Sequence, residues 1–104
     1  MLEPDLALAA TLLQIAGTIP TDIAWILRVD GHTDSVPINN LLYPSNWELS
    51  SARAISVVTF LVSQGVPAHR LVAAGFGEFQ PMDARDDEIG RRRNRRIELK
   101  LDQR

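Results

Sequence analysis

The sequence contains no cysteine, few aromatic residues and no long apolar run. The lack of cysteine excludes disulfides, thiolate nucleophiles and cysteine-ligated metals. The longest apolar stretch, residues 6–16, is interrupted by Thr11 and Gln14 and is far shorter than the ~20 residues of a membrane-spanning helix. The first residues also lack the basic segment and small-residue cleavage site of a secretory signal. Any export signal or membrane anchor would therefore have to lie outside these residues.

The totals describe an ordinary soluble domain with a slight excess of acidic residues. The 104 residues are 45% hydrophobic and 23% charged, with a formal net charge of -2. This length is enough for one hydrophobic core, so we expect a single domain over residues 1–104. A net charge near zero provides no general attraction for nucleic acid or anionic lipid, which would need a local basic patch.

Apolar periodicity and turn residues predict two long helices and three strands. The expected helices are 5–17 and 46–64, and the expected strands are 23–29, 70–77 and 97–101. A short helix or a loop is expected between the last two strands. Residues 35–45, with two prolines and two asparagines, are expected to form a surface loop. The order of these elements predicts an α/β (α+β) two-layer sandwich, in which helices pack on one face of a small mixed β-sheet.

The second helix has clear start and stop signals. Ser45 and Glu48 have the spacing of a capping box, and Gly65 follows the last apolar residue. Trp47 is expected to pack at the helix start, as Trp25 is expected to pack in the core. The predicted apolar face of this helix comprises Leu49, Ala52, Ile55, Val58, Phe60, Leu61 and Val62.

Residues 91–96 contain five arginines and are the best signal for nucleic-acid binding. A small nucleic-acid-binding module using this run is therefore the alternative function from a different class. However, four acidic residues lie between positions 83 and 88 and can neutralise the run, and few aromatics are interleaved for base stacking. We expect a solvated, internally paired face, and no nucleic-acid partner.

His32 raises the question of catalysis. It could act as a general base with Ser50 or Ser35 as nucleophile and Asp34 as orienting carboxylate. No nucleophile-elbow motif supports this, so we expect no enzymatic activity. A metal site from His32, Asp34 and His69 is also not expected, because three ligands at suitable spacing are not evident. No cofactor is predicted.

Four separated segments resemble the signature of the OmpA-like family, in order and approximate spacing. They are Gly31-His32-Thr33-Asp34, residues 46–54 (NWELSSARA), Gly75-Phe76-Gly77-Glu78 and residues 94–98 (NRRIE). The resemblance extends from Ile26 to Leu101, and the proline-containing loop is more similar to the MotB branch. It implies a non-enzymatic domain that binds the peptide stem of peptidoglycan rather than the glycan, so Trp25 and Trp47 are not expected to be platforms for stacking on sugars.

The resemblance also implies the binding residues. Family members hold diaminopimelate between an aspartate and an arginine, which correspond here to Asp34 and Arg53. Diaminopimelate carries an ammonium and a carboxylate on one carbon, and these groups suit Asp34 and Arg53 respectively. Further candidates are Thr33, Asn46 and Leu49, together with Arg95 or Arg96.

Several alternatives remain open at this stage. Asp34 and Arg53 could instead form a salt bridge that joins the loop to the helix. Asn46 could serve only as part of the helix start. Strand alternation puts Arg95 on the side of Ile97 and Arg96 on the side of Glu98, and does not select between the two arginines.

The resemblance finally implies a place in the cell. Full-length members carry a membrane segment or lipid anchor, so we expect this chain to be a fragment of a longer membrane-anchored protein. Such a protein would lie in the periplasm of a Gram-negative bacterium, tethered to the inner or outer membrane. It would attach an assembly such as a flagellar motor stator to the cell wall, and the resemblance allows a homodimer.

Overall fold

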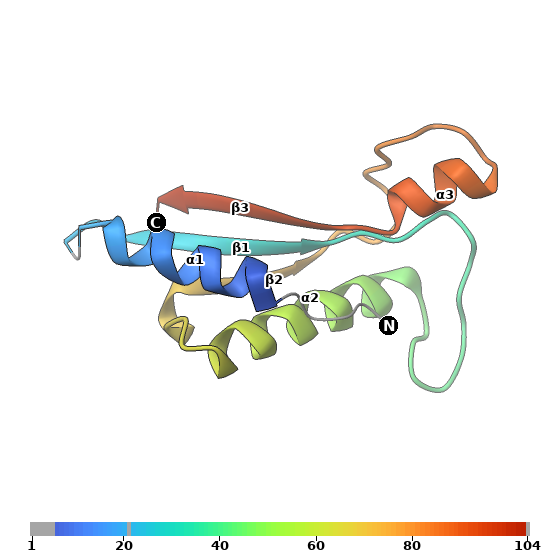
Figure 1. Ribbon diagram of the computed structural model, residues 1–104. Helices are drawn as coiled ribbons and strands as arrows, with labels where there is room; N and C mark the ends of the chain where they lie inside the picture. Colours follow the sequence, from blue (N-terminus) through green and yellow to red (C-terminus); the bar gives the residue numbers. More distant parts are fainter. Residues whose placement is uncertain (1–5, 21, 104) are drawn as a thin grey trace.

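The computed structural model describes residues 6–20 and 22–103, which form a three-stranded sheet with helices packed against it (Figure 1). The elements are α1 (Leu6–Thr18), β1 (Trp25–Gly31), α2 (Asn46–Ser63), the short 3-10 helix η1 (Ala68–Arg70), β2 (Leu71–Gly75), α3 (Glu88–Asn94) and β3 (Ile97–Gln103). The predicted α/β two-layer fold with a mixed sheet is confirmed.

The strand order β2-β1-β3 places β1 in the centre of the sheet. β1 runs parallel to β2 and antiparallel to β3, and Gly31 is in register with both Gly75 and Ile97. The carboxyl ends of the two parallel strands therefore lie beside the start of β3, at one end of the sheet. In α/β sheets, binding residues commonly gather at the carboxyl ends of the strands.

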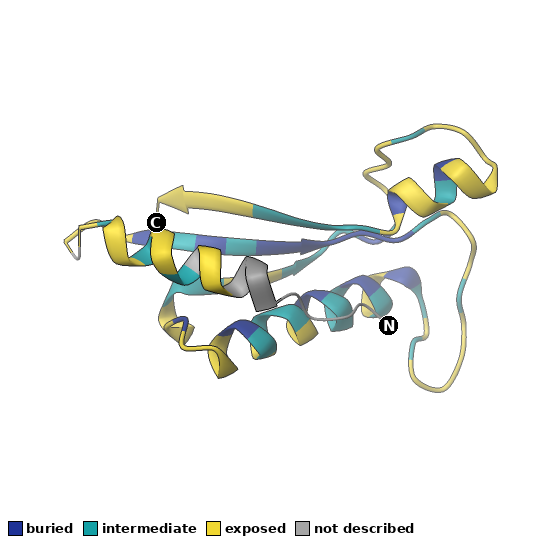
Figure 2. Cartoon of the chain, in the orientation of Figure 1, coloured by how far each residue is buried: buried dark blue, intermediate teal, exposed yellow. Residues whose placement is uncertain are grey.

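One face of the sheet carries the hydrophobic core. Trp25, Leu27 and Val29 alternate along β1 with less buried residues, and pack with Ala54 and Leu61 of α2. Side chains of α1 cover the same cluster, so both long helices lie on one face. Figure 2 shows the buried residues concentrated on β1 and along α2, whereas the far half of β3 is exposed.

The first turns of α2 lie very close to the ends of β1 and β2. A Cβ atom added to Gly31 would overlap the backbone carbonyl of Ser50, and one added to Gly75 would overlap Ser50 and Ser51. Ser50 is fully buried, and its hydroxyl accepts a hydrogen bond from the backbone N–H of Gly77 (2.9 Å). Glycine at the strand ends thus allows the helix start to contact the sheet edge.

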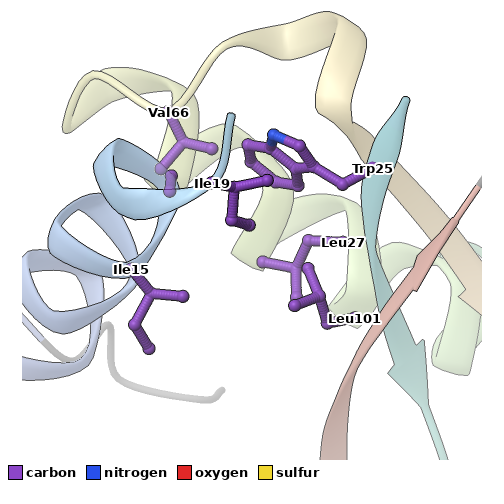
Figure 3. Close-up of a pocket in the computed structure, with 7 residues that line it drawn as sticks. Ile15, Ile19, Trp25, Leu27, Val66 and Leu101 are labelled. Atoms are coloured by element: carbon purple, nitrogen blue, oxygen red, sulfur yellow. The ribbon is translucent and has the colours of Figure 1, made fainter. Parts of the chain in front are cut away.

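A small apolar pocket lies at the opposite end of the sheet. Figure 3 shows Ile15 of α1 and Ile19, which follows α1, directed toward Trp25 and Leu27, and Val66 and Leu101 also line the pocket. This pocket is therefore separate from the opposite end of the sheet, where β1 and β2 have their carboxyl ends.

Several boundaries differ from the predicted ones. Ile23 is exposed rather than the start of a buried strand, and Arg70 belongs to η1 rather than to β2. β2 ends at Gly75, and the chain turns at Gly77, whose φ of 63° favours glycine. On α2, Ile55 (54% exposed) and Val62 (41% exposed) face solvent, because the buried stripe follows Ser50, Ala54 and Leu61.

The start of α2 differs in detail from the predicted capping box. The Ser45 hydroxyl accepts a hydrogen bond from the backbone N–H of Trp47, as a cap should. The same hydroxyl donates to the Glu48 carboxylate, so Ser45 and Glu48 are joined through their side chains and not through the backbone N–H of Ser45.

Within the described residues, no helix is both long and apolar enough to cross a membrane.

The close packing at Gly31 provides a test of the fold. Gly31→Ala should lower the free energy of unfolding by about 1–3 kcal/mol, because the new methyl group must displace the α2 backbone. Urea unfolding followed by circular dichroism measures this change. Gly17→Ala is the control, since nothing lies within 4 Å of its added Cβ, and it should be neutral or stabilising by up to about 1 kcal/mol. Equal effects of the two substitutions would contradict the packing argument.

Candidate functional site

Four segments meet at the edge of the sheet where β1 and β2 end. The backbone N–H of Thr33 donates to the carbonyl of Gly77 (2.9 Å), which joins the loop after β1 to the turn after β2. The backbone N–H of His32 donates to the carbonyl of Arg96 (3.0 Å), which joins the same loop to the start of β3. The helix α2 supplies the fourth segment. Residues distant in the sequence are therefore held together by backbone contacts.

Asp34 carries the negative charge of this site. Its side chain is only 13% exposed, and its Oδ2 accepts a hydrogen bond from the Arg95 guanidinium (2.7 Å). Its Oδ1 accepts from the backbone N–H of Val36 (3.0 Å), which fixes the carboxylate relative to the loop. A carboxylate offers about four acceptor positions, so Asp34 can accept further donors from a ligand.

Arg53 carries a positive charge without a carboxylate partner among residues 6–20 and 22–103. Its guanidinium donates to the neutral backbone carbonyl of His32 (2.9 Å), and no ion pair within 4 Å joins it to Asp34. The pKa of Arg53 is lowered mainly by burial and further by the positive charge of Arg95, while Asp34 acts in the opposite direction. The geometry does not contain the Asp34–Arg53 salt bridge that we weighed against a ligand-binding role.

The structure separates the roles of Arg95 and Arg96. Arg95 bridges Asp34 and Glu88, and these two hydrogen-bonded carboxylates raise its pKa, with Glu88 having the larger effect. Arg96 instead pairs with Glu98 on β3 and donates to the carbonyl of Gln80 (2.9 Å). Arg95 therefore lies at the charged site, whereas Arg96 joins β3 to the turn after β2.

The remaining predicted residues frame Asp34. Thr33 is buried and its hydroxyl donates to the Asp34 carbonyl (2.9 Å). The Asn46 amide is also buried, and its nitrogen donates to the carbonyls of Asp34 and Val36 and to the carboxylate of Glu78. Leu49 lies half-buried in the first turns of α2. Asn46 thus positions the loop after β1 through two contacts and joins it to the turn after β2 through the third.

The arrangement around His32 does not assemble the catalytic or metal-binding groups weighed above. The Ser50 hydroxyl bonds to Gly77 N–H and to the Trp47 carbonyl, and not to His32. His69 is on η1, beside Leu71 at the other end of β2 from His32. Within the described part of the chain, no three metal-binding side chains cluster.

The arginine run is largely paired with acidic side chains. Arg91 pairs with Asp86 and Glu88, and Arg93 pairs with Asp83. Arg85 also bonds to Asp83, and these hydrogen bonds hold the Asp83 pKa well below its usual range. The paired face that we predicted is what the structure contains, which counts against a phosphate-binding surface.

Sequence reasoning missed three contributors to the site. Glu88 holds Arg95, and Glu78 holds Asn46, although both are far from Asp34 in the sequence. Trp47 packs at the helix start by stacking its ring on Phe79, a contact that was not predicted, and it is half-exposed. The Gly-Phe-Gly-Glu segment was a signal for the turn that carries Glu78, but not for its contact with Asn46.

The fold and site are those of a small α/β domain with opposite charges side by side at a sheet edge. The chain belongs to the OmpA family, whose match covers residues 5–95. It is 42% identical over 91 residues to the uncharacterized protein YtxE of Bacillus subtilis, covering 86% of this chain and 35% of that protein. It is 38% identical over 72 residues to motility protein B of the same organism, covering 68% of this chain and 28% of that protein.

Solved structures support the same assignment. The C-terminal domain of Helicobacter pylori MotB superposes with a TM-score of 0.83 at 25% identity, covering 100% of this chain and 78% of that one. The peptidoglycan-associated lipoprotein of Burkholderia pseudomallei gives a TM-score of 0.77 at 25% identity, covering 92% and 75% respectively. Members of this family are generally structural or binding proteins rather than enzymes. The chain spans about a third of the length of the two Bacillus relatives, or less.

The buried His32 predicts a pH dependence of stability. Its Nδ1 is buried with no hydrogen-bond partner in the described chain, and its ring stacks on Phe76 (5.0 Å). Burial lowers the His32 pKa below its ordinary 6.5, and Arg96 and Lys100 act in the same direction against Glu98 and Asp30. The unfolded chain then binds the proton more readily than the folded one. This stabilising contribution should be complete above about pH 6.5 and decrease as the pH falls toward the folded-state pKa.

Urea unfolding of the wild type and His32→Gln between pH 4.5 and 8 measures this contribution. The wild type should lose more stability than the variant as the pH falls below 6.5. The matched control is His69→Gln, which removes an exposed histidine and should retain the wild-type dependence. An identical pH slope for the wild type and His32→Gln would show that His32 does not contribute.

Proposed function

We propose that this domain binds the stem peptide of peptidoglycan without chemistry, by holding the zwitterionic end of diaminopimelate between Asp34 and Arg53. The observation that carries the proposal is the arginine at the site. Arg53 is a partly buried cation whose hydrogen bond goes to a neutral carbonyl, next to a carboxylate that is itself oriented by Arg95. A desolvated cation without a counter-ion is costly unless an anion joins it.

The two charges fit the two groups of the ligand. The carboxylate of diaminopimelate would accept two parallel hydrogen bonds from the planar guanidinium of Arg53. Its ammonium would donate to Asp34, which retains acceptor capacity beyond its bonds to Arg95 and Val36. The start of α2 lies near the same place, and its positive end also favours a negative group.

The neighbouring residues would hold this pair of charges in position. Arg95 is fixed between two carboxylates and adds positive potential beside Arg53. Thr33 and Asn46 fix the backbone of Asp34 through its carbonyl. Leu49 would contact the aliphatic part of the diaminopimelate side chain. Arg96, just before β3, would support the loop after β1 through its carbonyl, which accepts the backbone N–H of His32. A preorganised site of this kind loses little conformational entropy on binding.

The relatives suggest what such binding is for. One solved relative is named a peptidoglycan-associated lipoprotein, and others are periplasmic domains of MotB. By analogy, the whole protein would anchor a membrane-bound assembly, such as a motor stator, to the cell wall from the periplasmic side. Its membrane anchor would lie in segments beyond this chain, and a homodimer is compatible with such an anchor.

Binding of diaminopimelate and of a soluble diaminopimelate-containing muropeptide tests the proposal, by isothermal titration calorimetry or NMR. Asp34→Asn and Arg53→Gln should each weaken binding about ten- to a hundred-fold, because each removes a hydrogen bond to a charged group. Lysine-containing muropeptide, which lacks the side-chain carboxylate, should bind more weakly and depend little on Arg53.

Arg92→Gln is the matched control for loss of a positive charge. Arg92 is exposed on α3 and forms no ion pair within the described chain, so its removal should leave muropeptide affinity within about two-fold. Wild-type affinity in both Asp34→Asn and Arg53→Gln would refute the site. Equal losses in Arg92→Gln and Arg53→Gln would indicate a general charge effect.

A further inference from the structure

Trp47 and Phe79, here called the aromatic pair, form an exposed stacked surface beside the charged site. Their ring centroids are 5.0 Å apart with an interplanar angle of 30°, yet Trp47 is 50% and Phe79 is 59% exposed. Trp47 belongs to the first turn of α2, and Phe79 to the turn after β2. Two large aromatic side chains are therefore fixed against each other while much of their surface faces solvent.

The backbone beneath the aromatic pair is adapted to it. Gly77 has a φ of 63°, and an added Cβ would lie 3.3 Å from the Phe79 ring and 3.5 Å from the Trp47 ring. Stacking alone would explain how the turn is joined to α2. It does not explain why the outward surface is aromatic, since exposed apolar area is unfavourable in water by roughly 25 cal/mol per Å². Such surfaces commonly mark binding sites.

The aromatic pair is continuous with the site at Asp34. Asn46, the neighbour of Trp47, bonds to the Asp34 carbonyl and to the carboxylate of Glu78, the neighbour of Phe79. The carbonyl of Gly77 accepts the backbone N–H of Thr33, the neighbour of Asp34 (2.9 Å). Two short hydrogen-bonded paths thus join the aromatic pair to the charged site.

We infer that the aromatic pair is a second subsite, which takes an N-acetylated amino-sugar ring of the glycan strand. This inference rests on the proposed function, because a stem peptide held at Asp34 and Arg53 is covalently attached to such a sugar. A pyranose ring presents C–H groups on its faces, and the negative faces of aromatic rings attract these weakly positive hydrogens. The sugar's hydroxyl and acetamide groups project from its edge.

Glu78 supplies the polar partner that such a ring requires. Its Oε1 accepts a hydrogen bond from Asn46 (3.3 Å), and its Oε2 has no hydrogen-bond partner among the residues described. A carboxylate beside an aromatic surface suits a hydroxyl or acetamide N–H donor. The combination of an aromatic surface and one oriented acceptor is more selective for a sugar than for a purely apolar partner.

Peptide-free glycan strands, prepared by removing the stem peptides enzymatically, test the inference directly. The chain has two tryptophans, so a ¹⁵N NMR spectrum resolves the exposed Trp47 indole N–H from that of the buried Trp25. Added glycan should shift the Trp47 signal and leave the Trp25 signal in place. Phe79→Ala should weaken glycan binding about two- to ten-fold, while affinity for free diaminopimelate stays within two-fold.

Ile55→Ala is the matched control, because it removes an exposed apolar side chain from the same helix. It should leave both affinities unchanged. Absence of any Trp47 shift with millimolar glycan would overturn the inference, as would an equal loss of glycan and diaminopimelate binding in Phe79→Ala. If another protein binds the aromatic pair instead, glycan will fail to shift Trp47.

The two proposals fail in distinguishable ways. Failure of the charged site appears as absent diaminopimelate binding in the wild type, whatever the glycan result. Failure of the sugar subsite appears as normal diaminopimelate binding, sensitive to Asp34→Asn, together with no response to peptide-free glycan.

Discussion

The contact between the first turns of α2 and the carboxyl ends of β1 and β2 determines the rest of this structure. Gly31 and Gly75 have no side chains at this contact, and Ser50 fills the remaining space with a hydroxyl that binds Gly77 N–H. Larger residues at either glycine would move the helix away from the sheet. Arg53 then could not reach the His32 carbonyl, and the loop that carries Asp34 would lose its support.

The two ends of the domain consequently differ in chemistry. At the end of β1, charged residues from four segments gather around Asp34, and hydrogen bonds to backbone groups and between side chains fix them. At the other end, apolar side chains that include Ile15 of α1 and Leu27 of β1 line a small pocket (Figure 3). The proposed binding site and the apolar pocket therefore lie at opposite ends of the sheet and use different parts of the chain.

The electrostatic pattern explains why neighbouring arginines have different roles. Arg91, Arg93 and Arg96 each have a carboxylate partner, and these pairs are mostly structural. Arg95 shares its charge between Asp34 and Glu88 at the site. Arg53 has no carboxylate partner within the described chain, neither one of its own nor a shared one. Burial and the nearby positive charge of Arg95 lower its pKa. Among the arginines named here, Arg53 is therefore the one whose charge is partly buried and bonded to a neutral carbonyl, which is why the proposed anion site is placed there.

The sequence by itself determined the two long helices, the three strands and their order, whereas it left α3 open between a short helix and a loop and did not predict η1. Apolar periodicity, the capping residues Ser45 and Glu48, and the glycines after strands are local signals, because they depend on residues a few positions apart. The four-segment resemblance also located Asp34 and Arg53. The predicted burial was wrong for Ile55 and Val62 and incomplete for Trp47, because burial depends on which side of α2 packs against the sheet.

Only the tertiary structure decided which charged groups meet. Asp34 and Arg95 are 2.7 Å apart although 61 positions separate them, and Arg53 is bound to a carbonyl rather than to Asp34. Strand alternation could not select between Arg95 and Arg96, because both precede Ile97, where the regular strand begins. The physical reason is that long-range ion pairs depend on strand register and helix position, which are set by packing of the whole core.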